Sequence, residues 1–311
     1  MASNLIAIVG PTASGKSDFA VRYAIYLKNN FGVEAEIVNA DSIQMYNALK
    51  IITSYPSYDS LKLVRHCLYG VLSPQEVISV AIWLDLVKKE IHRIHSENKV
   101  AIICGGTGFY INALINGISD IPVIPKYFRN EVLRKFQQLG REEFFNQLVF
   151  LDPELCKILH KNNTQRILRA YEVVTYTGKP LSSWWKSKSE CNYQISPIVL
   201  LPPRDRLNER CLIRINKMIA VGAIDEIRRF VEEYPNYTGI LCSVIGYHEI
   251  ISFLNKAISF DECVERMYVR TKQYAKRQST WFRNQLKSSQ IIYEFGDETE
   301  VASLKILINL K

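Results

Sequence analysis

Short apolar runs alternate with helix-like segments over the first third of the chain. Three runs have the length and composition of buried strands: 5–9, 35–39 and 99–104. Two segments carry apolar residues at helical spacing: 16–29 and 77–97. Strands that alternate with helices predict a parallel sheet of the doubly wound kind. Ligands of such sheets bind at the carboxyl ends of the strands, so the segments that follow each strand are the candidates for a site.

The pattern changes near Ile118. From 125 to 183 the apolar spacing is helical and no run resembles a strand. A strand-like run returns at Ile198–Leu201, and helices follow to about residue 287. We therefore expect a helical insertion and the core domain that it interrupts: 118–194, and 1–117 with 195–311.

A phosphate-binding sequence lies directly between the first predicted strand and the first predicted helix. It has the form Gly-x-x-x-x-Gly-Lys-Ser and consists of Gly10, Pro11, Thr12, Ala13, Ser14, Gly15, Lys16 and Ser17. In this context backbone N–H groups cradle phosphate oxygens, the lysine reaches over them and the serine hydroxyl ligates Mg²⁺. The alternative is a glycine-rich turn without a ligand. With this motif, the predicted fold class is α/β: a P-loop NTPase-like parallel sheet flanked by helices, with a helical insertion domain.

Two further candidates follow the second and third strands. Asp41 is placed at the mouth of the phosphate site, where its carboxylate would accept a proton from a nucleophile or bind Mg²⁺ through water. The alternative for Asp41 is an N-cap. The third strand runs into Gly105-Gly106-Thr107, whose hydroxyl would donate to a phosphate or bind the cation, or else only cap a tight turn. No acidic residue ends this strand, which disfavours an ATPase.

Cationic residues gather in the last third of the chain. Arg210 and Arg214 are four residues apart on a predicted helix, so their guanidinium groups would clamp a phosphate from one face. Residues 264–287 hold seven Lys or Arg and one acid, with aromatic residues between them, a composition that suits the phosphates and bases of a nucleic acid. The alternatives are a solvated helix face and a basic amphipathic helix whose aromatic residues belong to the core.

Charge, cysteine content and hydropathy limit the classes of protein to which the chain can belong. The net charge of +8 suits an anionic partner. The seven cysteines are widely spaced and form no C-x-x-C pair, which argues against a disulfide framework or a zinc site. No signal peptide and no apolar stretch of membrane-spanning length is evident. We expect a cytoplasmic protein with free thiols and no membrane partner.

Together, the motifs resemble those of the bacterial type of tRNA dimethylallyltransferase, also called tRNA isopentenyltransferase. The resemblance covers about residues 5–290, and the order and spacing of its short motifs are specific. They are Gly10–Ser17; Asp41-Ser42-x-x-x-Tyr46; Gly105-Gly106-Thr107-x-x-Tyr110; Asn163-Thr164-Gln165-Arg166-x-x-Arg169-Ala170-x-Glu172-Val173; Thr177-Gly178-Lys179-Pro180; Ile245-Gly246-Tyr247; and Thr271–Gln278 with Thr280–Arg283.

The resemblance implies a prenyl transfer to tRNA. A dimethylallyl group would pass from dimethylallyl diphosphate to N6 of the adenosine 3′-adjacent to the anticodon, in tRNAs that read codons beginning with U. That base has to leave its stack to reach an active site. The protein would be a monomer, with Mg²⁺ as its cofactor and the anticodon stem-loop of tRNA as its partner.

The same resemblance implies roles for individual residues. Asp41 would be the general base, with Thr107 and Lys16 as further catalytic residues. The diphosphate ligands would be the eight residues from Gly10 to Ser17, with Ser17 also on the metal, and Arg210 and Arg214. The residues implied in tRNA binding are Asp41, Ser42, Ile43, Gln44, Gln165, Arg166, Ile167, Leu168, Arg169, Ser243, Val244, Ile245, Gly246, Tyr247, His248, Lys276 and Arg277.

The chain departs from the family pattern in one loop. The family usually has Met-Asp-Ile-Gly-Thr-Ala-Lys-Pro where this chain has Leu49–Pro56, so Lys50 and Ile52 replace an acid and a glycine beside the expected site. The usual His-His-Leu is replaced by Arg65-His66-Cys67-Leu68. These changes bear on the shape of the loop and on catalytic efficiency.

Three other functions share part of the pattern. A small-molecule kinase of the P-loop class would not need the basic, aromatic segment 264–287. An adenylate isopentenyltransferase, which acts on a free nucleotide, is closer, but that segment and Gln165–Arg169 argue against it. A non-catalytic RNA-binding protein would leave Asp41 and Thr107 without a task. Salt-sensitive tRNA binding separates the first two from a tRNA-modifying enzyme, and product formation separates the third.

Overall fold

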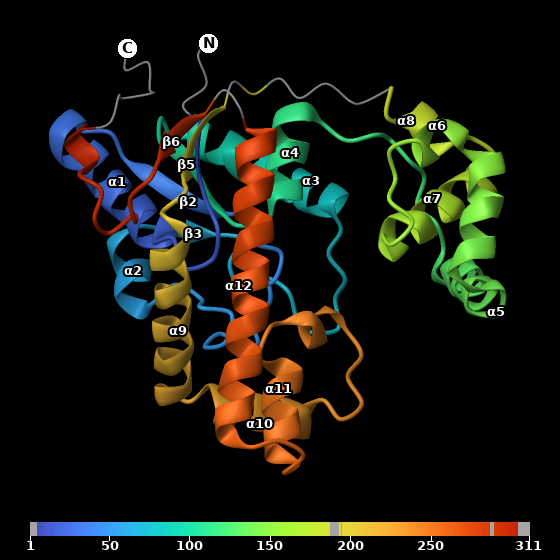
Figure 1. Cartoon of the computed structure of the whole chain (residues 1–311). Coiled ribbons are helices and arrows are strands. Elements are labelled where there is room, and N and C mark those ends of the chain that lie inside the picture. The colour runs from blue at the N-terminus through green and yellow to red at the C-terminus, as the bar shows by residue number, and fades with distance from the viewer. Residues whose placement is uncertain (1–4, 187–192, 194, 287–288, 304–311) are drawn as a thin grey trace. The chain divides into compact units, whose positions relative to one another are not determined.

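The computed structural model describes residues 5–186, 193, 195–286 and 289–303 (Figure 1). The last residues of the predicted insertion, 187–192 and 194, lie outside this range, as do Lys287 and residues 304–311 of the predicted core. The chain divides into two compact units: Met1–Ile115 with Tyr193–Lys311, and Asn116–Asn192. We call them the core unit and the helical unit.

The core unit contains a parallel sheet of six strands in the order β3-β2-β4-β1-β5-β6. The strands are β1 Leu5–Val9, β2 Ala35–Asn39, β3 His66–Cys67, β4 Val100–Gly105, β5 Ser196–Leu200 and β6 Gln290–Ile292. The four predicted strands correspond to β1, β2, β4 and β5. The sequence pattern did not predict β3 and β6, whose two and three residues are too few for a period to be recognised.

Helices cover both faces of this sheet. Those before the helical unit are α1 Lys16–Phe31, α2 Tyr58–Leu63, α3 Val80–Ser96 and α4 Gly108–Asn116. Those after it are α9 Arg204–Ala220, α10 Ala223–Glu233, η1 Ile240–Ser243, α11 Tyr247–Leu254, α12 Phe260–Gln285 and η2 Val301–Ser303. The chain passes from β1 through α1 to β2 in one direction across the sheet and from β3 through α3 to β4 in the other. Because such crossovers are right-handed, α1 and α3 lie on opposite faces.

The centre of the sheet is apolar on both faces. No residue of β1 is more than 2% exposed, as expected for a strand that is covered on two sides. Ile6 and Ile8 share a cluster with Phe19 and Tyr23 of α1. This packing fixes the end of β1 and the start of α1, between which the phosphate-binding sequence lies.

A second apolar cluster packs α9, α10, α11 and α12 together, through Ile215, Ile227, Ile250 and Met267. Figure 1 shows α9 and α12 side by side, and the two helices are in contact. The loop after β2 adds Ile52 to the same cluster. The C-terminal helices are therefore joined to the loops of the sheet by a common core.

Over its described residues, the helical unit forms four helices: α5 Lys126–Leu151, α6 Pro153–Cys156, α7 Thr164–Thr177 and α8 Leu181–Trp184. Its described residues form no strand, in agreement with their apolar spacing. α5 is interrupted at Gly140, whose φ of +75° and ψ of 170° are not helical. Phe144 and Leu148 of α5 are buried in one cluster with Ile167 and Val174 of α7.

Within the described residues, no helix combines the length and the hydropathy that a bilayer span requires. Six cysteines are described and all are free thiols. Cys191 lies outside the described residues.

A buried ion-pair cluster joins β2 to α3 and β4. The Glu36 side chain is only 3% exposed, and its carboxylate accepts from Arg93 at 2.5 Å and from Lys99 at 3.0 Å. Burial alone would raise the pKa of Glu36, but the hydrogen bonds from these two cations lower the pKa to about 2. The folded state therefore favours the carboxylate over the acid.

Glu36→Gln is expected to lower the free energy of unfolding at pH 7 by about 3 kcal/mol, since the variant loses a stabilised charge and leaves its cations partly unpaired. The contribution of Glu36 to the free energy of unfolding is fully present above the pKa that its carboxyl has in the unfolded chain, near 4.5. It is lost as the pH falls through the pKa in the folded protein, about 2. The difference between wild type and variant should therefore shrink from pH 5 towards pH 2. Urea unfolding at several pH values measures it.

Glu34→Gln is the matched control, because Glu34 is exposed and lies 3.9 Å from Lys99. Exposed ion pairs contribute roughly 0–1 kcal/mol, so this variant should remain close to wild type. An equal loss of stability in both variants, or a difference for Glu36→Gln that does not change with pH, would contradict the prediction.

Candidate active site

The phosphate-binding loop between β1 and α1 is held in a tight curl. Ala13 and Gly15 have φ values of +63° and +80°, and a Cβ on Gly10 would lie 2.7 Å from the Leu200 carbonyl oxygen of β5. The Lys16 ammonium donates back to the Pro11 carbonyl at 3.2 Å. The loop therefore curls around the lysine, with the first turn of α1 directly after it, as an anion site at a helix N-terminus requires.

Ser14 gives a test of whether this loop suits a phosphate. Its side-chain oxygen is buried and has no hydrogen-bond partner within the described part of the chain. A buried hydroxyl without a partner costs about 1–3 kcal/mol. A phosphate oxygen is an acceptor of the kind that this donor lacks, so the residues of the loop fit a phosphate group.

The order of the strands brings three of the predicted segments together. β2, β4 and β1 are neighbours in the sheet, so Asp41, Thr107 and the phosphate-binding loop follow adjacent strand ends. The Ser42 N–H donates to the Thr107 hydroxyl at 3.1 Å, and the Thr107 N–H donates to the Ala40 carbonyl at 3.1 Å. These bonds tie the segment after β2 to the segment after β4.

Asp41 is oriented by its own turn and by Asn39. Its Oδ1 accepts from the Ile43 N–H at 3.1 Å, in a turn rather than at the start of a helix, so the N-cap alternative is wrong. The fully buried Asn39 accepts from the Asp41 N–H at 2.8 Å and donates to the Asp41 carbonyl at 2.9 Å. Asn39 was not among the predicted residues, because an asparagine at a strand end carries no distinguishing pattern.

Lys16 and Arg214 form the cationic side of the site. Burial lowers the pKa of the Lys16 ammonium; the charge of Arg214 lowers it further, whereas the charge of Asp41 raises it. Burial also lowers the pKa of Arg214, and Asp41 again opposes the change. No ion pair of Arg214 occurs within the described ranges. Two cations that are half-buried near one carboxylate leave an excess of positive charge, which an anionic ligand would neutralise.

Arg210, one turn earlier on α9, has different partners. Its guanidinium lies 2.5 Å from Asp297 and 3.1 Å from Glu298 and stacks over the Phe295 ring at 3.9 Å. The two arginines share a helix, as expected, but their surroundings differ: Arg210 pairs with the C-terminal segment, whereas Arg214 lies near Lys16 and Asp41.

That C-terminal segment, Phe295–Thr299, packs against the phosphate-binding loop. The Gly296 N–H donates to the Ser14 carbonyl at 2.9 Å, and Arg22 of α1 donates to the carbonyls of Gly296 and Thr299. A Cβ on Gly296 would lie 2.2 Å from the Gly15 carbonyl oxygen, so the two backbones are in direct contact. The segment supports the loop from a position almost 300 residues later in the sequence, which no local pattern indicates.

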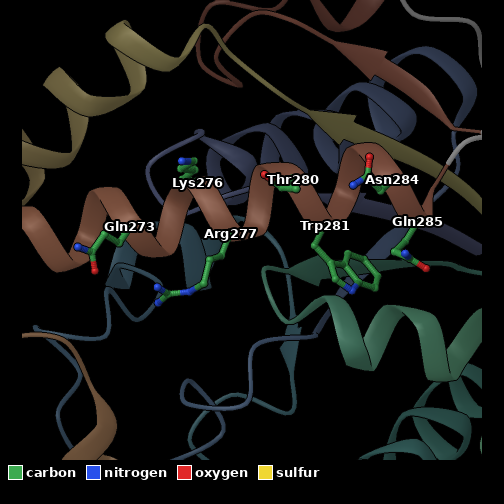
Figure 2. Close-up of a pocket in the computed structure, with 7 residues that line it drawn as sticks. All are labelled: Gln273, Lys276, Arg277, Thr280, Trp281, Asn284 and Gln285. Carbon is green, nitrogen blue, oxygen red and sulfur yellow. The ribbon is translucent and has the colours of Figure 1, made fainter. Parts of the chain in front are cut away.

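The basic face of α12 carries two of the residues predicted to bind tRNA. Lys276 and Arg277 are exposed and border a groove of about 510 Å³ with Gln273, Thr280, Trp281, Asn284 and Gln285. Figure 2 shows Arg277 and Trp281 on the same side of the helix and Lys276 on another. The Trp281 ring lies at the start of α4, where a Cβ on Gly108 would be 2.4 Å from it.

The segments around Ser42 and Gly246 are only partly available to a ligand. In the first, Asp41, Ser42, Ile43 and Gln44 are half-buried, and the Gln44 amide donates to the carbonyls of Thr53 and Ser54 at 3.0 and 2.8 Å. In the second, Ser243 and His248 are exposed, Ile245 is half-buried, and Val244, Gly246 and Tyr247 are buried. The buried members of the second segment fix its shape, so contact with a ligand falls to its two ends.

The helical unit holds the remaining predicted residues at the start of α7. Gln165 and Arg166 are exposed, Leu168 and Arg169 are half-buried, and Ile167 is fully buried in the core of the unit. Burial lowers the pKa of Arg169, the neighbouring Glu172 raises it, and the charge of Arg129 on α5 lowers it again. Arg129 therefore lies near Arg169, which also pairs with Glu172 at 3.5 Å. The sequence analysis did not single out Arg129.

The divergent loop Leu49–Pro56 has a defined role in packing. Ile52 is 4% exposed, and a Cβ on Gly246 would lie 2.5 Å from its Cδ1 atom. The N–H groups of Ile51 and Ile52 donate to the Glu226 carboxylate of α10 at 2.8 and 3.0 Å. Lys50 is exposed, with its ammonium 5.1 Å from the centre of the Tyr55 ring. The loop is thus anchored to the C-terminal helices.

Comparison with known proteins gives matches over most of the chain. A family model described as IPP transferase matches residues 44–285. The tRNA dimethylallyltransferase of Pelagibacter ubique is 40% identical over 288 residues, which are 92% of this chain and 90% of that protein. The tRNA dimethylallyltransferase of Ehrlichia canis is 40% identical over 290 residues, which are 92% of this chain and 94% of that protein.

Two solved structures are similar in fold. The tRNA isopentenylpyrophosphate transferase of Bacillus halodurans matches with a TM-score of 0.66 and 29% identity, covering 93% of this chain and 89% of that chain. A eukaryotic dimethylallyltransferase acting on tRNA matches with a TM-score of 0.78 and 26% identity, covering 93% of this chain and 73% of that chain. With the parallel sheet described above, these matches confirm the predicted fold class.

The different partners of the two arginines lead to different expectations for their variants. Arg214→Ala should weaken binding of inorganic diphosphate by roughly tenfold or more, because a charge-assisted contact without a competing ion pair is lost. Arg210→Ala should mainly lower the midpoint of thermal unfolding, since it releases the C-terminal segment. Isothermal titration calorimetry and a thermal melt on both variants measure this. Equal losses of affinity would contradict it.

Restoring the usual glycine of the divergent loop is expected to harm this chain. Ile52→Gly should lower the free energy of unfolding by about 3 kcal/mol, because a buried side chain leaves a cavity against Gly246 and Met267. Lys50→Asp, at an exposed position of the same loop, should change the free energy of unfolding by less than about 0.5 kcal/mol. Urea unfolding of both variants checks this. An Ile52→Gly protein as stable as wild type would show that the loop is not adapted to its isoleucine.

Proposed function

The chain belongs to the IPP transferase family, and from that premise we propose that it transfers a dimethylallyl group from dimethylallyl diphosphate to N6 of the adenosine 3′-adjacent to a tRNA anticodon. The matches confirm the family and the class of enzyme, a prenyltransferase, that the motifs predicted. The prenyl donor, the position in the tRNA and the residue roles are the proposed part. A cytoplasmic location and a monomeric state remain predictions.

One observation carries the proposal: a carboxylate and a phosphate-binding loop follow β2 and β1, two strands of one sheet that only β4 separates. The charge of Asp41 raises the pKa values of Lys16 and Arg214, so the carboxylate lies near both cations. A base and an anion site at such spacing suit a reaction in which a proton is lost as a phosphate group departs. A simple anion-binding protein would not need the carboxylate.

The reaction balances with these groups alone. The lone pair of N6 forms a bond to C1 of the dimethylallyl group, and the C1–O bond to the diphosphate breaks with its electrons leaving on oxygen. The proton of N6 passes to the Asp41 carboxylate. Lys16, Arg214 and the backbone N–H groups of the loop stabilise the charge that develops on the diphosphate. Thr107 accepts from Ser42, so its own hydroxyl hydrogen remains to donate to a diphosphate oxygen.

The residues present fit a magnesium ion that is held largely by the substrate. Ser17 is exposed on the first turn of α1 and offers its hydroxyl, whereas the described residues contain no cluster of three or more His, Cys, Asp or Glu side chains. Diphosphate oxygens and water would supply the other ligands of such an ion. When bound, the ion adds positive charge to the leaving group.

Exposed cationic residues support tRNA as the acceptor. Lys276 and Arg277 on α12, with Arg166, Arg169 and Arg129 of the helical unit, provide the cations that phosphates of an RNA backbone need. The exposed ends of the second loop segment, Ser243 and His248, add polar contacts. A free nucleotide would leave these surfaces without a function.

The direct assay uses unmodified tRNA that reads codons beginning with U, dimethylallyl diphosphate and Mg²⁺. Mass spectrometry of the digested RNA should show an isopentenyl adenosine, and free AMP should not be modified. Modification of AMP but not of tRNA would identify an adenylate isopentenyltransferase instead. Tight, salt-sensitive tRNA binding without any product would favour a binding protein.

Asp41→Asn is expected to lower kcat by roughly a hundredfold to ten-thousandfold, the usual effect of losing a general base. The asparagine oxygen can still accept from the Ile43 N–H, so the turn should keep its shape. The dissociation constant for tRNA should therefore change by less than about threefold. Single-turnover kinetics and filter binding measure the two quantities.

Asp59→Asn, on the exposed helix α2, is the control and should keep wild-type kcat. If Asp41→Asn turned over as fast as wild type, Asp41 would not be the base. If both variants lost activity together, the effect would not be specific to the proton transfer.

A further inference from the structure

Gln278 of α12 lies buried between the two loops that form the phosphate site. Its side-chain Oε1 accepts from the Thr12 N–H of the phosphate-binding loop at 2.8 Å. Its Nε2 donates to the Gly106 carbonyl, in the segment after β4, at 2.9 Å. The residue is only 7% exposed. One side-chain amide therefore joins a loop near the N-terminus to another almost 100 residues later.

Both contacts act on functional parts of the loops. Thr12 lies within the turn whose N–H groups face a phosphate, and Gly106 directly precedes Thr107. A Cβ on Gly106 would lie 2.5 Å from the Gln278 Nε2 atom, so the glycine allows the amide to approach. A side-chain amide offers a donor and an acceptor on one terminal group. Gln278 thus bridges the two loops beyond the paired ends of β1 and β4.

The same helix carries the proposed RNA contacts. Lys276 and Arg277 directly precede Gln278 and are exposed on the groove of Figure 2. One turn or more earlier, Arg270 forms an ion pair with Glu249, which accepts from the Gly246 N–H of α11 at 2.9 Å. A continuous helix thus connects cationic side chains on its surface with a buried clamp on the loops.

From this arrangement we infer that Gln278 is a positioning residue that couples tRNA binding on α12 to diphosphate binding. The inference rests on the proposed function. RNA that holds Lys276 and Arg277 fixes α12, and α12 holds Thr12 and Gly106 in place through one amide. A loop that is already ordered pays less entropy when the diphosphate binds, so each substrate raises the affinity for the other.

The test replaces the amide without changing its length. Gln278→Met keeps the volume of the side chain but makes neither hydrogen bond, and Gln278→Glu keeps the acceptor for Thr12 but places a second oxygen against the Gly106 carbonyl. The matched control is Ser279→Ala, because the Ser279 hydroxyl donates to the Ala275 carbonyl within α12 and reaches neither loop. Circular dichroism and thermal melts select folded variants.

Calorimetry then measures the dissociation constant of magnesium diphosphate with and without tRNA. In wild type and Ser279→Ala, tRNA should tighten diphosphate binding by about fivefold or more, within the usual range of coupling between sites. We call the dissociation constant without tRNA divided by that with tRNA the coupling ratio. In Gln278→Met the coupling ratio should fall towards one, and the affinity for tRNA alone should change by less than about twofold. KM for dimethylallyl diphosphate should rise more than KM for tRNA, and Gln278→Glu should lie between Met and wild type.

The outcomes separate the inference from the proposed function. A folded Gln278→Met protein that keeps the wild-type ratio overturns the coupling role, whether or not the wild type modifies tRNA. A ratio of one in wild type overturns it too. A ratio near one in Gln278→Met, together with the wild-type ratio in Ser279→Ala, supports the coupling role of Gln278. If the wild type failed to make isopentenyl adenosine while the ratio still fell to one only in Gln278→Met, that outcome would reject the proposed reaction and support the coupling role of Gln278.

Discussion

The close approach of β2 and β4 at their carboxyl ends is the constraint on which the site depends. A Cβ on Gly105 would lie 2.2 Å from the Ala40 carbonyl oxygen, so only glycine lets these two strands end side by side. The contact places Asp41 and Thr107 on neighbouring strand ends, and β1 adds the phosphate-binding loop next to them. The side chains of Asp41 and Thr107 are short, so the backbones that carry them have to be this close for both to serve one site.

The second requirement is that long-range contacts hold the loops rigid. The phosphate-binding loop is supported by Gln278 from α12 and by Gly296 from the C-terminal segment. Loops with an unpaired backbone are flexible, and a flexible loop would lose entropy each time a diphosphate bound. These bonds reduce that cost to the extent that α12 and the C-terminal segment are themselves held in place. The last third of the chain therefore contributes to the site even though most of its residues do not face a ligand.

This division explains how much the sequence could predict. The strands β1, β2 and β4, the loop at 10–17 and the position of Asp41 follow from local motifs and periodicity, and the structure has them where the pattern put them. Asn39, Gln278 and the segment 295–299 could not be predicted in the same way, because their roles come from partners that are distant in the sequence. The pairing of Arg210 with Asp297 is of the same kind: helical spacing gave the shared face of the two arginines, but not their partners.

In the proposed reaction, the electrostatics of the site would favour the departure of a diphosphate over its mere binding. Lys16 and Arg214 are half-buried near each other with Asp41 as the nearby opposite charge, and desolvation and mutual repulsion lower the pKa of the lysine. An anion relieves that repulsion, and it does so more strongly as its charge grows. When the C1–O bond breaks, negative charge accumulates on the diphosphate, so the stabilisation increases towards the transition state. The same two cations would bind an unreactive phosphate without this gain. In the proposed reaction the proton passes to Asp41, which follows β2, with only β4 between that strand and β1.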